Sequence, residues 1–432
     1  MSFLNGGADR TGQAEVVRLT PERGAEIIEL DQIVWAASPT AERARLSIEA
    51  LDMSRTIGVE EPGGRLAAIA SAWAFDTPVP GGRVDAGGLT WVGVRPECRR
   101  RGYLRALVER HWADCRERGE AVSMLFSSQL PIYGRFGYGT ASSGVGLTLP
   151  KGASLRPLPE SAKAGPAVDL RFETVSFEAH GALVDAIEQQ AGYGPARRPG
   201  WTACTTSAAW RLMLEDEKPA GPRLEAGRIA ISERAGLPTG YALVRRDGNW
   251  ESGNPAGTLT IRAFQALDPA SGYALWDLLV NMDLNTKVIT PLLTLDDPLF
   301  GWLEDWRSQS VTLRDGLHVR LVDLPAALTA RRYALPIDLR LAVTDRLVSE
   351  NAGVWVLQAG PDAATCRRVA DLDESETDVS LDIRQLGAIY LGGIGALGLM
   401  DAGLIHERTP GAVEFLSRAF RGARDPAVWP VF

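Results

Sequence analysis

The chain has 432 residues, of which 45% are hydrophobic and 23% are charged, so it is long enough for about three globular domains of roughly 150 residues and excludes a disordered protein. The formal net charge of −8 disfavours nucleic acid and anionic membranes as general partners and suits a cationic one. Four cysteines, with no Cys-x-x-Cys pair, argue against a zinc site and a disulfide framework and fit a reducing compartment.

The sequence contains no readable targeting or membrane segment. The N-terminal stretch lacks a charged start followed by an apolar run, so we expect a cytoplasmic protein and leave export without a signal open. The longest uncharged run, Leu386 to Met400, contains five glycines and is shorter than the ~18 residues of a spanning helix. We interpret it as two packed helices broken at Gly392 and Gly393.

The first informative element is an apolar strand from Thr90 to Val94. A strand of this composition fits the centre of a sheet, buried on both faces. Gly93 interrupts it, and a glycine inside a strand marks a bulge or a close backbone approach, either of which frees N–H and C=O groups for a ligand. The alternative is a plain core strand that one glycine weakens.

An arginine-rich turn follows, in which Arg99, Arg100, Arg101 and Gly102 directly precede a segment with apolar residues at helical spacing. Unpaired helix-start N–H groups, the positive end of the helix dipole and guanidinium groups therefore converge on one place. Gly102 lets the main chain approach a phosphate without a Cβ in the way, and Arg105 adds a cation one turn on. The pattern predicts a phosphate-binding loop, with a solvated charge cluster as the alternative.

A second strand, Ala121 to Phe126, ends in the polar residues Ser127, Ser128 and Gln129, and the string IYGRFGYG follows from Ile132 to Gly139. Strand, arginine turn, helix and strand in this order can hold a pyrophosphate at a helix start with a pantetheine arm along a strand edge. We therefore interpret residues 89–138 as an acyl-CoA site.

The rest of the chain contains two further units. A Pro-, Gly- and Ser-rich linker at 149–167 precedes strands at 228–245 and then a strand, a helix and a strand, which repeats the order of the first unit. The repeat has DPASGYALW, without arginine, in place of PECRRRGYL, so we expect a degenerate copy that binds no coenzyme. The last unit begins near Leu313 and ends in a helix with Thr409 as the predicted N-cap and Pro410 at its first position.

The motifs V-x-V, P-x-x-R-R-R-G-x-L-R and I-Y-G-R-F-G-Y-G resemble the acetyl-CoA site of GNAT acetyltransferases, specifically the Eis (enhanced intracellular survival) family. VRLVDLPAAL near Leu321, AIYLGG near Tyr390 and an apolar C-terminal tripeptide extend the resemblance over most of the chain. It implies an α+β fold of tandem GNAT domains, each a mixed sheet flanked by helices, and then a sterol-carrier-like domain. The expected boundaries are 1–155, 156–311 and 312–432.

The resemblance also implies the site residues. Acetyl-CoA would contact the backbone and side chains of the strand, the arginine loop and the second strand end, namely Val92, Gly93, Val94, Arg99, Arg100, Arg101, Gly102, Tyr103, Leu104, Arg105, Ser128 and Gln129. A phenol beside the sulfur can protonate the leaving CoA thiolate, and position within the motif assigns this general acid to Tyr133 in preference to Tyr138.

The proton acceptor in the family is the free C-terminal carboxylate, which here belongs to Phe432. The apolar residues and the proline of Trp429-Pro430-Val431 can dock and stiffen this end, against the alternative of a tail packed on its own domain. The family often has an acidic penultimate residue, and Val431 replaces it, which places one contact to a cationic substrate in doubt.

The expected function is therefore acetyl-CoA-dependent N-acetylation of aminoglycosides or other polyamine- or lysine-type amines, with several positions open to acetylation. No activated Cys or Ser is evident, so direct attack in a ternary complex is expected, without an acyl-enzyme or a metal. The resemblance implies a homohexamer. Two alternatives are a non-catalytic CoA or lipid carrier and a scaffold with a relic coenzyme site.

Overall fold

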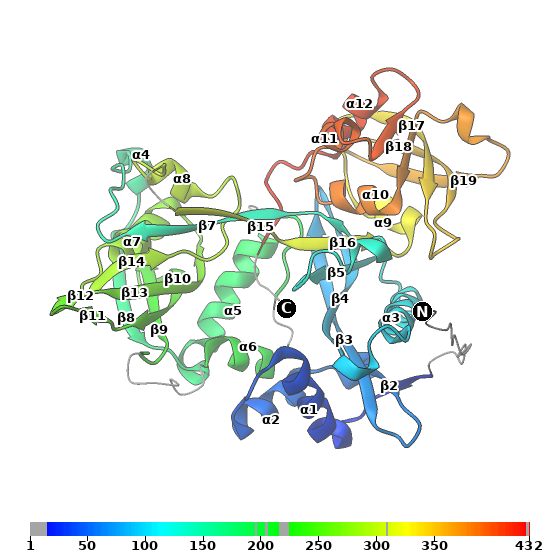
Figure 1. Ribbon diagram of the computed structural model, residues 1–432. Coiled ribbons are helices and arrows are strands. Elements are labelled where there is room, and N and C mark those ends of the chain that lie inside the picture. Colours follow the sequence, from blue (N-terminus) through cyan, green and yellow to red (C-terminus); the bar gives the residue numbers. More distant parts are fainter. Residues whose placement is uncertain (1–14, 195–196, 204–205, 216–223, 308–309, 429–431) are drawn as a thin grey trace, which may run out of the picture.

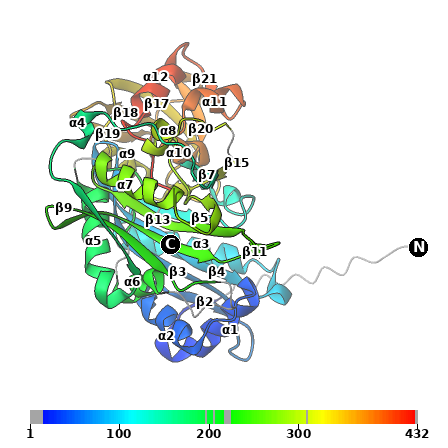
Figure 2. The ribbon, with the colours of Figure 1, turned by 90° about the vertical axis from the view of Figure 1, so that its left-hand side faces the viewer.

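A computed structural model of the protein describes residues 15–432 apart from 195–196, 204–205, 216–223, 308–309 and 429–431. The expected docking of Trp429, Pro430 and Val431 therefore lies outside the described residues. The protein has three units, each built on a mixed β-sheet flanked by helices. The first two units lie side by side, and the third lies at one end of the molecule (Figures 1 and 2).

The first sheet has seven strands in the order β1-β2-β3-β4-β5-β16-β6. Only β4 and β5 are parallel among its described pairs. The strands are β1 (Val16–Arg18), β2 (Ile57–Glu60), β3 (Leu66–Val79), β4 (Gly82–Val94), β5 (Val122–Phe126), β6 (Gly139–Thr140) and β16 (Leu317–Leu321).

Helices cover both faces of this sheet. Successive side chains of β3 point to opposite faces, so each face packs against a different helix. Ala68 and Ala70 pack in the cluster that contains Leu107 and Trp112 of α3, whereas Ile69 between them packs with α1. The helices are α1 (Gly24–Trp35), α2 (Ala41–Ala50) and α3 (Tyr103–Glu117), with the short helices η1 (Pro21–Arg23), η2 (Met53–Arg55), η3 (Pro96–Cys98) and η4 (Gly134–Phe136).

The second sheet repeats this architecture in the order β15-β7-β14-β13-β10-β9-β8, again with one parallel pair, β13 and β14, joined through a helix, α7. Asp268 caps α7 by accepting a hydrogen bond from the amide of Ser271 at 3.0 Å, at the point where the first unit has its arginines. The strands are β7 (Ser143–Pro150), β8 (Val168–Thr174), β9 (Arg228–Arg234), β10 (Leu237–Asp247), β13 (Gly257–Ala266), β14 (Asn285–Ile289) and β15 (Ser310–Asp315), with a separate hairpin of β11 (Trp250–Glu251) and β12 (Asn254–Pro255). The helices are α4 (Glu160–Lys163), α5 (Phe177–Tyr193), α6 (Ser207–Leu214), α7 (Pro269–Val280) and α8 (Pro298–Trp302).

The two sheets exchange strands. β7 directly follows the first unit in sequence but lies in the second sheet, between β15 and β14, and β16 follows the second unit but lies in the first sheet, between β5 and β6. Figure 1 shows β7, β15 and β16 crossing between the two units. Residues 312–321, which we expected in the third domain, thus complete the sheets of the first two, and the expected boundaries stay predictions.

The third unit has a five-stranded sheet in the order β19-β18-β17-β20-β21. Its strands are β17 (Ile337–Thr344), β18 (Gly353–Ala359), β19 (Ala364–Val369), β20 (Val379–Asp382) and β21 (Ile405–Glu407), and its helices are α9 (Leu324–Ala330), η5 (Glu374–Glu376), α10 (Ile383–Ile389), α11 (Ala396–Asp401) and α12 (Ala412–Phe420). In the described part of the chain, no helix combines the length and apolar character needed to cross a bilayer.

The predicted start of the last helix is wrong. The residue that caps α12 is Gly411, whose φ of +85° is left-handed and suits glycine, and the helix begins at Ala412. The Thr409 hydroxyl instead donates to the Asp378 carboxylate at 2.7 Å. A tertiary hydrogen bond therefore takes the side chain that the local pattern assigned to the cap.

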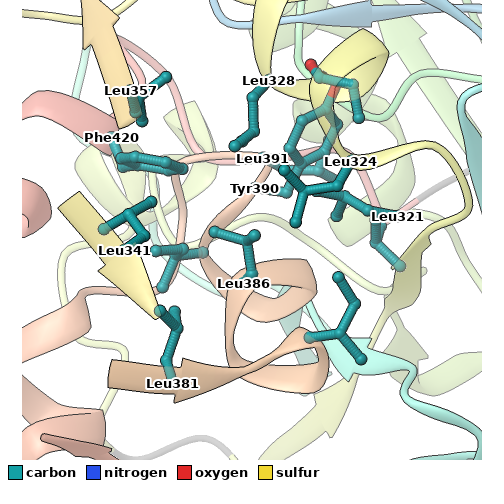
Figure 3. Close-up of a cluster of buried hydrophobic side chains, with 14 of the residues drawn as sticks. Leu321, Leu324, Leu328, Leu341, Leu357, Leu381, Leu386, Tyr390, Leu391 and Phe420 are labelled. Atoms are coloured by element: carbon teal, nitrogen blue, oxygen red, sulfur yellow. Dashed lines mark hydrogen bonds between the residues drawn. The ribbon is translucent and has the colours of Figure 1, made fainter. Parts of the chain in front are cut away.

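One apolar core joins the third unit to the first sheet. It contains β16 residues such as Leu321 together with leucines from β17, β18, β20 and α10 (Figure 3). The same cluster includes Ala86 of β4 and Met124 of β5, both fully buried. The third unit is consequently packed directly behind the β4–β5 pair and is not a loosely attached module.

Truncating Leu386 on α10 should destabilise the protein by about 2–5 kcal/mol, because its side chain is 0% exposed in this core and Leu386→Ala leaves a cavity. Urea unfolding measures the change. The matched control is Leu404→Ala at a side chain that is 50% exposed, where we expect a change within about 0.5 kcal/mol. Equal effects of the two substitutions would contradict the shared core.

Candidate active site

The centre of the candidate site is the point where β4 and β5 separate. Their parallel pairing ends at Gly88 and Met124, while β4 continues to Val94. Its pairing with β3 shifts by one residue between the Ile69–Gly93 and Ser71–Thr90 pairs, and Trp91 in this bulge has a φ of +53°. The edge of β4 that faces β5 is thus left with backbone groups available to a ligand.

Gly93 predicted either a bulge or a close approach to the backbone, and the structure contains both, at different residues. A Cβ on Gly93 would lie 3.0 Å from the Leu30 side chain and 3.2 Å from that of Val34, both on α1. The glycine therefore permits close packing of α1 on β4, and the bulge lies at Trp91.

The arginine turn forms the start of α3. Gly102 is the residue before the helix and has a φ of +84°, and Arg100 is also left-handed with a φ of +62°. Arg99 and Arg100 are exposed toward the cleft, whereas Arg101 donates to the Glu61 carboxylate at 2.7 Å and the Glu97 carbonyl at 3.1 Å. Two of the three consecutive arginines are thus available to an anion, and the third is held in an ion pair.

A cleft of about 790 Å³ lies along these elements. It is lined by every expected coenzyme residue except Gly93 and Arg101, and by Tyr133. Its other lining residues are not among the expected site residues; they are Val34, Trp35, Cys98, Ile132, Arg135, Phe136 and Leu347. Leu347 belongs to the third unit, and no local signal in the sequence pointed to it.

The two tyrosines of the IYGRFGYG string lie in different environments. The rings of Tyr133 and Tyr138 meet edge to face with centroids 5.9 Å apart. The Tyr138 hydroxyl is fully buried and bonded to the Ser123 hydroxyl at 2.7 Å and the Trp112 indole N–H at 3.2 Å. Among the described residues none is hydrogen-bonded to the Tyr133 hydroxyl, and burial raises the pKa of Tyr133 to about 12. Of these two tyrosines, only Tyr133 lines the cleft, and among the described residues its protonated phenol has no hydrogen-bond partner.

A buried histidine lies behind these tyrosines. His111 Nε2 is 2.7 Å from the Ser123 hydroxyl, and burial lowers the pKa of His111 to about 4. The imidazole is therefore neutral at physiological pH and belongs to the buried hydrogen-bonded group of Ser123 and Tyr138.

The C-terminal residue lies at the end of the β4–β5 ladder. The Phe432 ring has its centroid 4.8 Å from that of Phe75 and 5.3 Å from that of Phe126. A Cβ on Gly88 would lie 2.8 Å from the Phe432 ring, so the last ladder residue leaves room for it. Upstream, the Ala427 amide donates to the Pro199 carbonyl at 2.8 Å.

A second hollow of about 530 Å³ lies between the first two units, and Phe75 is part of its wall. Asp76 is paired with Arg83 at 2.7 Å, and the Arg83 guanidinium lies 4.5 Å from the Tyr193 ring centroid. Asp185 on α5 also lines the hollow, and within the described residues no hydrogen bond or ion pair engages its carboxylate. The hollow therefore has an excess of negative charge.

The described residues contain no group of three or more His, Cys, Asp or Glu side chains placed to hold a metal ion.

Comparison with known proteins identifies the class. Models of the acetyltransferase (GNAT) domain match residues 15–141 and 204–321, and a model of the sterol carrier protein domain matches residues 324–429. These matches define a GNAT acetyltransferase and confirm the predicted α+β architecture.

The chain is 35% identical over 385 residues to an uncharacterized N-acetyltransferase of Streptomyces avermitilis, covering 87% of this chain and 88% of the relative. It is 28% identical over 363 residues to N-acetyltransferase Eis of Mycobacterium tuberculosis, covering 83% and 84%. The crystal structure of Eis1 from Mycobacterium abscessus superposes with a TM-score of 0.77 at 26% identity, covering 97% of this chain and 100% of that one. The protein belongs to the Eis-like N-acetyltransferases.

Removing the two tyrosine hydroxyls should affect stability differently. Tyr138→Phe leaves buried partners unpaired at Ser123 and Trp112 and should lower the free energy of unfolding by about 1–3 kcal/mol. Tyr133→Phe removes a hydroxyl without such partners and should change it by less than about 0.5 kcal/mol. Urea titrations of both variants measure the difference, and a larger loss for Tyr133→Phe would contradict these environments.

Proposed function

We propose that the protein transfers the acetyl group of acetyl-CoA to amino groups of aminoglycosides or other polyamine- or lysine-type substrates, by direct attack in a ternary complex. The observation that carries the proposal is the convergence of the arginine loop, Tyr133 and Phe432 around the point where β4 and β5 separate. We also propose acetylation at several positions, a cytoplasmic location and a homohexamer, the last to be measured by light scattering.

The proposed coenzyme position follows the shape of the cleft. The pyrophosphate lies against the α3 start, where helix amides, Arg99 and Arg100 meet. The pantetheine arm then runs along the free edge of β4 at Val92 and Val94 toward Ser128 and Gln129, which place the thioester near Tyr133.

Tyr133 acts on the leaving sulfur in this proposal. The amine nitrogen attacks the thioester carbonyl, a C–N bond forms, the C–S bond breaks, and the electron pair leaves with the sulfur. With a pKa of about 12 the phenol is fully protonated at neutral pH, so it donates a hydrogen bond to a thiolate whose pKa is about 8.5. Complete proton transfer is uphill at these values, and the phenol mainly stabilises the developing negative charge.

The carboxylate of Phe432 receives the proton that the amine loses, or orients the amine through water. A terminal carboxylate with a pKa near 3.5 is a weak base for an ammonium group unless its surroundings are dry. The aromatic contacts of the Phe432 ring with Phe75 and Phe126 support such a placement.

The acceptor amine is proposed to enter from the hollow between the first two units. Its volume of about 530 Å³ lies within the usual range for small-molecule sites, roughly 300–1,000 Å³. The unpaired Asp185 carboxylate supplies a counter-charge for an ammonium group, and Phe75 connects this hollow to the terminal residue. A substrate with several amines can present each of them in turn.

Thiol release from acetyl-CoA with tobramycin tests the role of Tyr133. Tyr133→Phe should lower kcat roughly a hundredfold at a similar KM for acetyl-CoA, since the hydrogen bond forms in the transition state. Because the pKa is raised, the phenol stays protonated as the pH rises, and no alkaline loss due to Tyr133 should appear below about pH 11. A Tyr133→Phe variant with the wild-type rate would overturn the assignment, and CoA binding without transfer to any amine would favour a carrier.

A chain extended by three alanines past Phe432 tests the carboxylate. The extension moves the charge away from the ring contacts of Phe432 and should reduce kcat at least tenfold, as expected for loss of a positioned proton acceptor. The control is the Phe432→Leu variant, which keeps the terminal charge in place with an apolar side chain. Full activity of the extended chain would remove the carboxylate from the mechanism.

A further inference from the structure

A fully buried arginine connects the third unit to the loop that carries Tyr133. Arg320 lies on β16 and is 0% exposed. Its guanidinium donates to the Phe136 carbonyl at 2.8 Å and to the Asp345 carboxylate at 2.7 Å. One arginine thus bridges the loop of the first unit and a carboxylate of the third.

The loop itself is a compact turn closed on the backbone of Tyr133. The amides of Phe136 and Tyr138 both donate to the Tyr133 carbonyl, at 2.9 and 3.3 Å. The carbonyl that Arg320 holds therefore belongs to the same turn as Tyr133, three residues further on.

Three glycines of this loop face the bridging elements. A Cβ on Gly134 would lie 2.9 Å from the Arg384 guanidinium carbon, and a Cβ on Gly137 would overlap the Arg320 guanidinium. A Cβ on Gly139 would overlap the backbone of α10 at Arg384. The three glycines of IYGRFGYG thus leave room for β16 and the third unit to pack closely against this loop.

Asp345 also organises the loop that closes the cleft. Its second carboxylate oxygen accepts from the amides of Leu347 and Val348, each at 3.1 Å, and Asn351 donates to the first at 3.2 Å. Leu347 lines the coenzyme cleft, and Val348 packs in the cluster that contains Tyr133 and Phe136. One carboxylate thus fixes both the arginine and a wall of the cleft.

The Arg320 guanidinium also lies 4.1 Å from the centroid of the Trp112 ring, whose N–H donates to Tyr138. The Tyr138 ring in turn meets the Tyr133 ring edge to face. The arginine consequently reaches the phenol by two routes, through the backbone of the turn and through Trp112 and Tyr138.

We propose that Arg320 and Asp345 are positioning residues of the acetyltransferase reaction, through which the third unit holds Tyr133 in the place where it meets the leaving sulfur. This inference rests on the proposed function, because it requires Tyr133 to act in the transition state. A buried ion pair by itself adds little to stability, and this pair is directed at the turn that carries Tyr133.

Two conservative variants test the pair. Asp345→Asn keeps an oxygen for the Leu347 and Val348 amides but puts an NH2 group where Arg320 donates, and Arg320→Lys cannot reach both Phe136 and Asp345. Each variant is measured alone and combined with Tyr133→Phe, by thiol release from acetyl-CoA with tobramycin. Rates are normalised to CoA sites counted by titration, so a poorly folding variant is measured on its folded fraction.

We expect each single variant to lower kcat about tenfold with the KM for acetyl-CoA changed less than about twofold, because the phenol is displaced and the phosphate loop is not. In the Tyr133→Phe background the same substitutions should have almost no further effect on kcat, since the group they position is absent.

The control is Arg331→Lys, at an equally buried arginine whose guanidinium donates within the third unit to the Tyr390 and Phe420 carbonyls. It should lose stability but keep the wild-type kcat per CoA site. Unchanged kcat in both test variants, or an equal further loss in the Tyr133→Phe background, would overturn the positioning role. A Tyr133→Phe variant with the wild-type rate would instead overturn the proposed role of Tyr133 on which this inference rests.

Discussion

The ladder between β4 and β5 ends after three residue pairs, at Gly88 and Met124, and the rest of the site depends on this interruption. A continuous sheet would use the backbone groups of Val92 and Val94 for its own hydrogen bonds and leave none for a ligand. The bulge at Trp91 lies beyond the last β4–β5 pair, and the cleft lies along this unpaired part of β4. The Phe432 ring occupies the space above Gly88, so the terminal residue lies at the same separation point.

Keeping two adjacent strands apart requires support from outside the sheet, and the exchanged strands provide it. β16 lies beside β5 and carries Arg320 into the interior, where its charge is matched by Asp345 of the third unit. The apolar core in Figure 3 continues from the third unit into β4 and β5. We therefore expect the first and third units to unfold cooperatively. A sterol-carrier-like domain thus becomes part of the structure that shapes an acetyltransferase cleft, in addition to carrying the chain terminus toward it.

The cleft at the α3 start and the hollow between the first two units carry charges of opposite sign. Arg99 and Arg100 lie at the α3 start, and Arg101 is paired with Glu61. The hollow between the first two units contains Asp185, which has no cationic partner within the described residues. In the proposed reaction, an anionic coenzyme would lie against the arginine turn, and a cationic amine would come from the hollow that contains Asp185. The net charge of −8 gives the overall sign but not this division, which depends on which side chains are already paired.

The sequence by itself determined the parts of the site that depend on neighbouring residues. The helix start after Arg99–Gly102, the repeated strand, helix and strand of the second unit, and the two short helices either side of Gly392 follow from local spacing, and all three are present. Tertiary structure decided what depends on distant residues. It assigned the bulge to Trp91 and Gly93 to helix packing, paired Arg101 with Glu61, moved the last helix start to Ala412 and brought β16, Arg320 and Leu347 to the first unit. These outcomes depend on contacts between residues far apart in the sequence, such as Arg320 and Phe136, which are 184 positions apart, and a local pattern carries no signal for them.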